Sequence, residues 1–254
     1  MSHSSYTPFS DAEIEQFIHD GYVILRNGFS SDLAAACRDL VWAQSGVDRN
    51  DPGTWAEPII HLQDTFRDGP FAGILNDRIG AAVDQLAGEG RAYLHDFFGW
   101  WPILFPGFPG PGGWHVDGSN FHHRLQSREQ ALVTLYLFSD IEPGDGGTAL
   151  ACGSHHDVAR LLCDAEPEGL SIEALTKSLP EVESGRVVEV TGSAGDIAFL
   201  HPFLVHGFSA NRGQSVRFAC NPQYPFKEEM NLMRPDGDHS PVEEAIRVGL
   251  GWSA

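Results

Sequence analysis

The chain has 254 residues, 42% of them hydrophobic, so it can bury a full core, and one domain is the simplest expectation. Its 35 acidic and 16 basic residues give a net charge of -19, which would repel a nucleic acid backbone. The same charge disfavours large polyanionic carriers such as coenzyme A. We therefore expect a small-molecule partner that is neutral or cationic, and no nucleic acid.

Targeting signals and paired cysteines are both missing from the sequence. No apolar stretch has membrane-spanning length, and no basic, apolar leader opens the chain. The four cysteines form no Cys-x-x-Cys pair, which predicts free thiols rather than a zinc ribbon or a disulfide framework. We expect a cytoplasmic protein without membrane contact, and the sequence carries no signal for its oligomeric state.

Helical patterns dominate the first third of the chain. Ser10-Asp-Ala-Glu13 is a capping box, and apolar residues follow at helical spacing as far as Gly21. Residues 22–25 then have the pattern of a strand, and residues 31–45 have that of a second amphipathic helix. A third helical region, interrupted by Gly and Pro, is expected between residues 70 and 87.

From Arg91 onward, short β-prone runs alternate with Gly, Pro, Asp and Asn, which is typical of a sandwich or jelly roll. The expected strands are 131–141, 148–152, 186–191, 196–200, 204–208 and 215–221. Helical inserts are expected at 157–162 and 171–178, and a capping box at 240–243 opens a C-terminal helix. We interpret residues 1–254 as one domain: a helical N-terminal third (about 1–90), a β core (about 91–224) and a C-terminal extension (225–254).

A His-x-Asp motif at His115-Val-Asp117 would place an imidazole and a carboxylate on one face of a strand. The motif is weak by itself, because it occurs a second time at 155–157. Two His and one carboxylate leave iron(II) positions open for a 2-oxo acid and dioxygen, and the far carboxylate of that acid suits an Arg fork. His206 and Arg217 complete this combination.

The combined motifs resemble those of the phytanoyl-CoA dioxygenase family of iron(II)- and 2-oxoglutarate-dependent oxygenases. The matching stretches are W-H-V-D-G at 114–118, G-D-G-G-T at 144–148, G-S-H at 153–155, G-D-I-A-F at 195–199 and H-P-F-L-V-H-G at 201–207, followed by Asn211 and Arg217. The resemblance covers most of the chain. It implies a mainly β fold, a double-stranded β-helix (a cupin-like jelly roll) with N-terminal helices packed on it and a short C-terminal helix.

The resemblance also implies functional residues. Iron would be bound by His115, Asp117 and His206, and 2-oxoglutarate would be anchored by Arg217. We add Thr148, which ends the G-D-G-G-T motif, and Tyr136, at a strand position where relatives often have Trp close to the co-substrate. His155 lies where the family does not bind iron.

Two departures from relatives affect the expected chemistry. Position 219 is Ala, so the hydroxyl that some of these enzymes place two residues after the anchoring Arg is missing, and a second donor must come from elsewhere. Asp117 retains the carboxylate that halogenating relatives replace by a small residue. The resemblance therefore implies hydroxylation, desaturation or oxidative ring closure at a C–H bond, coupled to the conversion of 2-oxoglutarate to succinate.

His201 and His206 compete for the third ligand position, because residues five apart face opposite sides of an unbroken strand. If the chain forms a hairpin about 212–213, His206 lies opposite Ala219 and shares a face with Arg217. A bulge would exchange the faces of His201 and His206, so the spacing alone leaves both open. The match to the family favours His206 as the third ligand.

Substrate signals are few. Trp100, Trp101 and Trp114 flank a Pro/Gly-rich loop beside the metal motif, and their indole faces could stack on sugar or other rings, although core or lid packing explains them equally well. We expect natural-product tailoring on a substrate that is neutral or cationic, with a glycosylated one as the narrower hypothesis. Enzymes that close orthoester or methylenedioxy rings in oligosaccharide antibiotics belong to the same broad family.

Two other classes remain open from the residues alone. A cupin-like metal-dependent isomerase or hydrolase would also use two His and a carboxylate, but it has no need of Arg217. A non-catalytic carbohydrate-binding jelly roll would have structural histidines and no need of an intact triad.

Overall fold

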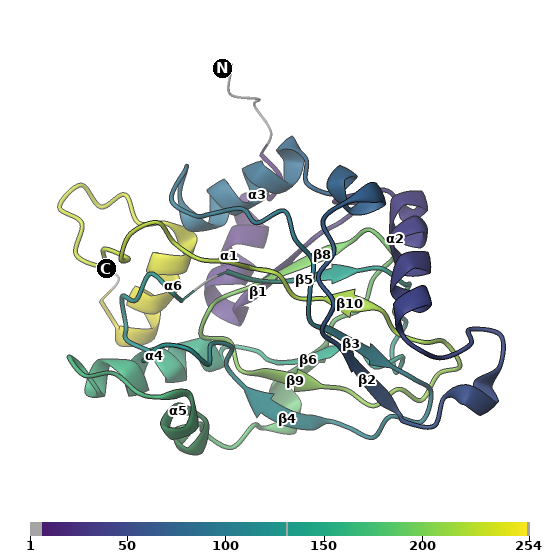
Figure 1. The fold of residues 1–254 in the computed structure, drawn as a ribbon. Coiled ribbons are helices and arrows are strands. Elements are labelled where there is room, and N and C mark those ends of the chain that lie inside the picture. Colours follow the sequence, from purple (N-terminus) through teal and green to yellow (C-terminus); the bar gives the residue numbers. More distant parts are fainter. Residues whose placement is uncertain (1–6, 131, 253–254) are drawn as a thin grey trace.

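Two antiparallel sheets face each other in the computed structural model, which describes residues 7–130 and 132–252 (Figure 1). The larger sheet has the order β1 (Tyr22–Leu25), β8 (Ile197–Leu200), β5 (Leu132–Leu137) and β10 (Ala219–Cys220), and β11 (Gln223–Tyr224) also pairs with β5. The smaller sheet has the order β4 (Gly112–His115), β9 (His206–Phe208), β6 (Thr148–Ala151) and β7 (Val187–Glu189). β2 (Ile59–Leu62) and β3 (Trp101–Leu104) form a separate pair.

The α-helices are α1 (Asp11–Asp20), α2 (Ser31–Gln44), α3 (Asp77–Ala87), α4 (Ser154–Asp164), α5 (Ile172–Ser178) and α6 (Pro241–Leu250). Short 3₁₀ helices lie at η1 (Pro52–Thr54), η2 (Gly69–Gly73) and η3 (Ser184–Arg186). Both expected capping boxes are formed, at Ser10 and Ser240, and Gly21 ends α1 with a φ of 88°. Within the described chain, none of the helices combines the length and apolarity needed to cross a bilayer.

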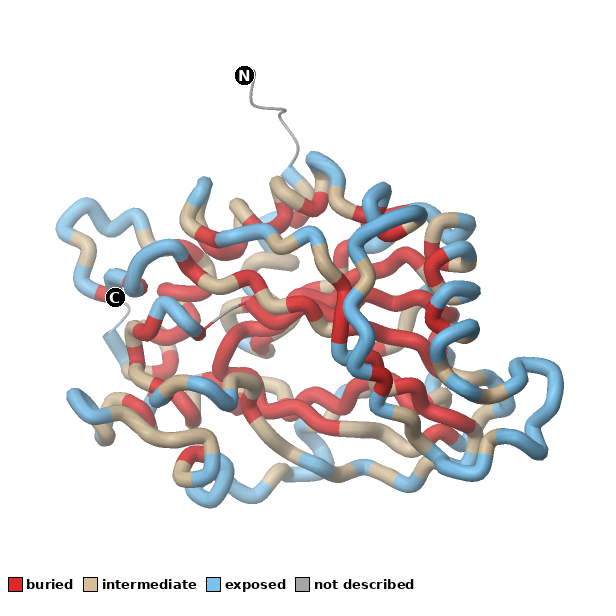
Figure 2. Tube along the Cα trace, viewed as in Figure 1, coloured by how far each residue is buried: buried red, intermediate tan, exposed pale blue. Residues whose placement is uncertain are grey.

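Alternation along the strands creates two hydrophobic clusters. In β8, Ile197 and Phe199 pack toward the helices, whereas Ala198 and Leu200 pack between the two sheets. Figure 2 shows the buried residues gathered along the central strands and the exposed ones on outer helix faces and loops. The helices therefore cover the outer face of the larger sheet, and the inner faces of both sheets enclose the second cluster.

The expected hairpin between 204–208 and 215–221 is wrong. β9 pairs with β4 and β6 in the smaller sheet, whereas β10 pairs with β5 in the larger one. The Gly- and Asn-containing segment between them carries a turn signal, but such a signal does not specify which strand the chain pairs with next. His206 is thus not the partner of Ala219, and the parity argument built on that pairing does not apply.

Candidate active site

His115 and His206 are direct cross-strand partners in β4 and β9, and His206 is also the partner of Leu150 in β6. Directly opposite residues of an antiparallel pair share one face. Leu150 belongs to the cluster between the sheets, so both imidazoles face the interior. Their ring centroids are 4.5 Å apart.

Asp117 follows β4 in a loop and completes a compact group of three. Its Oδ1 lies 3.4 Å from Nε2 of His115 and 3.6 Å from Nε2 of His206. One ligand atom from each of the three residues lies within 4.8 Å of the others. The strand therefore supplies the first histidine and the following loop supplies the carboxylate, so the expected single strand face for His-x-Asp is not what brings them together.

Hydrogen bonds on the far side of each ring orient the two imidazoles. Nδ1 of His115 is 2.6 Å from the carbonyl of Gly113, and Nδ1 of His206 is 2.9 Å from the carbonyl of Leu204. A carbonyl only accepts, so Nδ1 carries the proton and a neutral ring directs the lone pair of Nε2 toward Asp117. Two acceptors then face a carboxylate oxygen, an arrangement that a bound cation satisfies.

Without a bound cation, an imidazole can instead take up a second proton on Nε2 and donate it to Asp117, so the charges of this group depend on one another. Burial opposes the charged form of His115, but the hydrogen bond and negative charge of Asp117 outweigh it and raise the pKa of His115. Burial alone would raise the pKa of Asp117, yet the charge of His206 and the hydrogen bonds from both imidazoles hold it well below its usual range. The carboxylate is therefore ionised and available to a metal.

Arg217 lies just before β10, where its backbone pairs with Leu104 of β3, and its side chain enters the space between the sheets. Its guanidinium donates to the carbonyl of Gly146 at 3.0 Å, to that of Pro102 at 2.9 Å and to the Thr148 hydroxyl at 3.2 Å. The side chain is buried, which lowers its pKa to about 10, while the charge of Glu189 acts in the opposite direction. At neutral pH the group remains a cation.

A cavity of about 60 Å³ lies between the two imidazoles and Arg217. His115, His206 and Thr148 line it from the smaller sheet, Leu135 lines it from the larger one, and Arg217 lines it from the segment that pairs with β3. The structure thus brings together the three expected iron ligands, the expected anchor and Thr148. These side chains can hold a cation at one end and an anion at the other.

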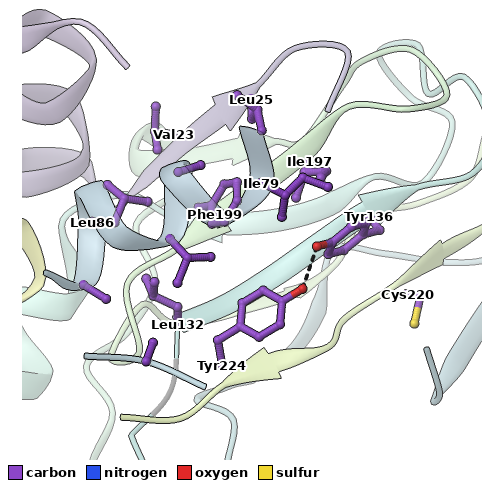
Figure 3. Close-up of a cluster of buried hydrophobic side chains, with 14 of the residues drawn as sticks. Val23, Leu25, Ile79, Leu86, Leu132, Tyr136, Ile197, Phe199, Cys220 and Tyr224 are labelled. Atoms are coloured by element: carbon purple, nitrogen blue, oxygen red, sulfur yellow. Dashed lines mark hydrogen bonds between the residues drawn. The ribbon is translucent and has the colours of Figure 1, made fainter. Parts of the chain in front are cut away.

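Tyr136 is placed elsewhere, which corrects the expectation that it contacts the co-substrate. It is the neighbour of Leu135 in β5 and points to the opposite face, into the cluster beneath the helices. Its hydroxyl is 2.6 Å from that of Tyr224, and Figure 3 shows the two hydroxyl groups facing each other among apolar side chains. Tyr136 is therefore a core residue.

The three tryptophans differ in environment. Trp101 is fully buried and packs edge-on against Phe66 and Phe71, so the expectation of a substrate contact is wrong for it. Trp114 is half-buried against the core. Trp100 is 67% exposed and has a φ of 57°, an uncommon conformation for a bulky residue. Only Trp100 is freely available to a ligand.

His155 and His201, which were not expected to bind iron, lie away from the triad and near α1. His155 is buried at the start of α4 and contacts the carbonyl of Ile18 at 3.0 Å. Both ring nitrogens of His201 are engaged, with Nδ1 accepting from the amide of Phe203 and Nε2 lying 3.2 Å from the carbonyl of Val242. Neither ring has a nitrogen directed at Asp117.

Sequence reasoning missed the residues that hold the second oxygen of Asp117. Nε2 of Gln223 donates to Oδ2 at 2.9 Å, and Nδ2 of Asn221 lies 3.5 Å from the same atom. The available signal was a pair of amide side chains, Asn221 as the last residue of the expected strand 215–221 and Gln223 two residues beyond it. That signal is weak, because a polar residue at a strand end is usually solvated.

The family model described as phytanoyl-CoA dioxygenase (PhyH) matches residues 17–219. Ectoine dioxygenase of Stutzerimonas stutzeri (strain A1501) is 29% identical over an alignment 234 residues long, and the match covers 83% of this chain and 74% of that protein.

Two solved structures share the architecture. The non-haem α-ketoglutarate-dependent carbocyclase SnoK from nogalamycin biosynthesis superposes with a TM-score of 0.56 at 19% identity, covering 91% of this chain and 89% of its own. HygX from Streptomyces hygroscopicus with nickel, 2-oxoglutarate and hygromycin B bound has a TM-score of 0.53 at 17% identity, covering 88% and 90%. These likenesses confirm the expected double-stranded β-helix.

Proposed function

Because this chain belongs to the phytanoyl-CoA dioxygenase family, we propose that His115, Asp117 and His206 bind its iron(II) and that Arg217 binds the distal carboxylate of 2-oxoglutarate. The protein is a 2-oxoglutarate-dependent non-haem iron dioxygenase, with dioxygen as the second co-substrate. Family membership decides against the metal-dependent isomerase or hydrolase and against the non-catalytic jelly roll.

The observation that carries the co-substrate assignment is the buried Arg217 guanidinium. Among the described residues, its hydrogen-bond partners are two carbonyls and a hydroxyl, and none is a carboxylate. These three bonds use three of five N–H groups, so two remain for a ligand. Glu189 acts on this cation only at a distance; a buried charge without a directly bonded counter-charge is costly, and an anion in the adjoining cavity would pair with it.

Charge balance also supports 2-oxoglutarate as the anion in this cavity. Iron(II), the Asp117 carboxylate, a 2-oxoglutarate dianion and the Arg217 cation sum to zero, as a cavity shielded from water requires. The Thr148 hydroxyl accepts from Arg217 and still has its own proton to donate. We assign Thr148 as the second donor to the distal carboxylate, in place of the hydroxyl that Ala219 lacks.

When bound, iron(II) supplies the activation of dioxygen that couples decarboxylation of 2-oxoglutarate to oxidation of a C–H bond. The chain's own part is to bind and orient. Asp117 occupies the ligand position that a halide would need, so the proposed outcomes are hydroxylation, desaturation or ring closure. The apolar side chains between the sheets, Leu135 among them, limit water near the reacting groups.

The proposed substrate is a neutral or cationic small molecule, because the chain carries a net charge of -19. HygX has been solved with hygromycin B, SnoK comes from nogalamycin biosynthesis, and the curated relative is named for ectoine. We propose a role in natural-product tailoring. With Trp101 in the core, the hypothesis of a glycosylated substrate depends on Trp100, which presents an exposed indole.

The class of reaction and the binding sites can be tested before the substrate is known. Anaerobic addition of iron(II) and then 2-oxoglutarate should produce the visible charge-transfer absorption of a chelated iron. Arg217→Met should require much more 2-oxoglutarate for the same absorption, whereas Arg212→Met, at an exposed site in the same segment, should not. Equal titrations for the two variants would remove Arg217 from the co-substrate site.

The substrate class can then be screened by succinate release in air. Neutral and cationic probes, with ectoine and hygromycin B among them, are compared with an anionic acyl-coenzyme A at equal concentration. We expect stimulation by members of the first group only. Stimulation by the acyl-coenzyme A alone would contradict the charge argument.

A further inference from the structure

We infer that Gln223 is a positioning residue that holds Asp117 as a one-oxygen metal ligand, an inference that rests on the proposed iron site. The two oxygens of Asp117 have different partners. Oδ1 lies 3.4 Å from Nε2 of His115 and 3.6 Å from Nε2 of His206. Oδ2 accepts a 2.9 Å hydrogen bond from Gln223, and Asn221 lies at the limit of hydrogen bonding, 3.5 Å away.

Gln223 reaches Asp117 from the opposite sheet. It lies in β11, where its Cα is the partner of Val133 in β5, and Val133 packs between the sheets. Opposite residues share a face, so the amide of Gln223 is directed toward the smaller sheet. Asp117 itself lies beyond the end of β4 and is followed by Gly118, whose φ is 117°. No strand ladder orients this carboxylate, and the amide of Gln223 does so instead.

The orientation matters because a carboxylate can bind a metal through one oxygen or through both. Two imidazoles and one oxygen leave three positions on octahedral iron(II), which 2-oxoglutarate and dioxygen together require. A second Asp117 oxygen would occupy one of them. The amide of Gln223 engages Oδ2 without adding a positive charge that would compete with the metal for the carboxylate.

A purely structural role makes a different prediction. The Asp117 side chain is 14% exposed, and Asn221 and both imidazoles lie near its oxygens with or without Gln223. If Gln223 served only to satisfy a buried carboxylate, its loss would destabilise the metal-free protein. If it positions the ligand, its loss would weaken metal binding and leave metal-free stability unchanged.

The test uses Gln223→Met, which keeps the length of the side chain and removes the amide, with Gln223→Ala as a second variant. Gln126→Met, at a half-buried glutamine in the loop before β5, is the matched control. Cobalt(II), an oxygen-stable probe, is titrated into each metal-free protein, and 2-oxoglutarate is titrated into each cobalt-loaded one. Thermal midpoints are recorded without metal.

We expect Gln223→Met to raise the Kd for cobalt(II) about 10- to 100-fold, to weaken 2-oxoglutarate binding at saturating cobalt, and to leave the metal-free midpoint at the value of Gln126→Met. An unchanged Kd overturns the inference. So does weaker binding together with a lower metal-free midpoint in both Gln223 variants, or failure of both to fold. The proposed iron site fails separately, if wild type binds no cobalt or if His206→Ala binds it as wild type does.

Discussion

His201 and His206 are five residues apart, yet His206 points between the sheets and His201 packs against α1, where its ring centroid is 6.1 Å from that of Phe17. The two histidines therefore have separate environments. Residues 201–205 precede β9 and include turns, so strand alternation alone did not decide their orientations. The difference makes a direct test of the third ligand possible.

We expect His206→Ala to lose iron(II) binding, because it removes one of three donor atoms. His201→Ala should bind iron(II) normally and be less stable, because it leaves the amide of Phe203 buried without its acceptor. Anaerobic iron titration and thermal denaturation measure the two properties. The reverse pattern of iron binding would move the third ligand to His201.

Arg217→Met should raise the 2-oxoglutarate concentration needed for turnover far more than the iron(II) concentration. Truncating one partner of a buried, hydrogen-bonded charge pair costs about 2 to 5 kcal/mol. Succinate formation at varied 2-oxoglutarate and fixed iron measures the effect, with Arg212→Met as the exposed control. An unchanged KM for 2-oxoglutarate would rule out this anchor.

Thr148→Val should weaken 2-oxoglutarate binding, whereas Thr148→Ser should retain most of it. Valine keeps the shape of the side chain and removes the hydroxyl, and a hydrogen bond to a charged group contributes roughly 1.5 to 3 kcal/mol. The Kd from the anaerobic absorption titration provides the comparison. Similar values for the valine and serine variants would mean that the second donor lies elsewhere.

The tryptophan variants should separate folding from substrate binding. Trp101→Ala should cost about 3 to 5 kcal/mol of unfolding free energy, because it empties a packed core position. Trp100→Ala should change stability little and lower substrate-stimulated succinate formation while sparing the slow reaction without substrate. Denaturant unfolding and succinate assays test this pair, and normal stimulation of the Trp100 variant would leave the stacking hypothesis without support.

Acid should destabilise the protein through its buried histidines. Burial lowers the pKa of His201 to about 3. Burial and the neighbouring His201 and His156 lower the pKa of His155 as well. The unfolded chain binds these protons below its ordinary His pKa of about 6.5, so stability is retained above that pH and lost as pH falls toward the folded values, by about 1.4 kcal/mol per pH unit for each such group.

Denaturant unfolding between pH 7 and pH 4 measures this slope. His201→Gln, which removes the titrating ring, should give a shallower slope than wild type. His61→Gln, at an exposed position, should leave the slope unchanged. Identical slopes for all three proteins would assign acid denaturation to other groups.

Elements with strong local signals could be predicted from the sequence. The capping box of Ser10 and the C-terminal Gly21 bound α1, and β1 and the start of α2 fall at their expected residues. β3 was not expected, because Pro102 lies within it and proline disfavours a strand. Its pairing with β2 depends on tertiary contacts that no short window contains.

Some residues of the candidate site could also be predicted from the sequence, and others could not. The metal triad could be predicted because a motif specifies it, and the structure places those three side chains together. Tyr136 could not be placed correctly, because every residue of β5 is buried and a strand covered on both faces shows no alternation. Leu135 and Tyr136 are adjacent in the sequence and point into different hydrophobic clusters. Only the register of β5 in the folded sheet shows which of the two faces the cavity.

The groups proposed to bind ligands come from separate parts of the sandwich: both histidines lie on the smaller sheet, whereas Arg217 lies just before β10 of the larger one and pairs with Leu104 of β3. A bound metal and co-substrate would therefore link these parts of the sandwich to one another. By mass action, a ligand present at 100 times its Kd adds about 2.7 kcal/mol to the stability of the fold that binds it. Loss of the ligands would weaken the contacts between the two sheets. The ligand-bound protein should therefore exchange the amide hydrogens of its inner strands more slowly than the ligand-free protein.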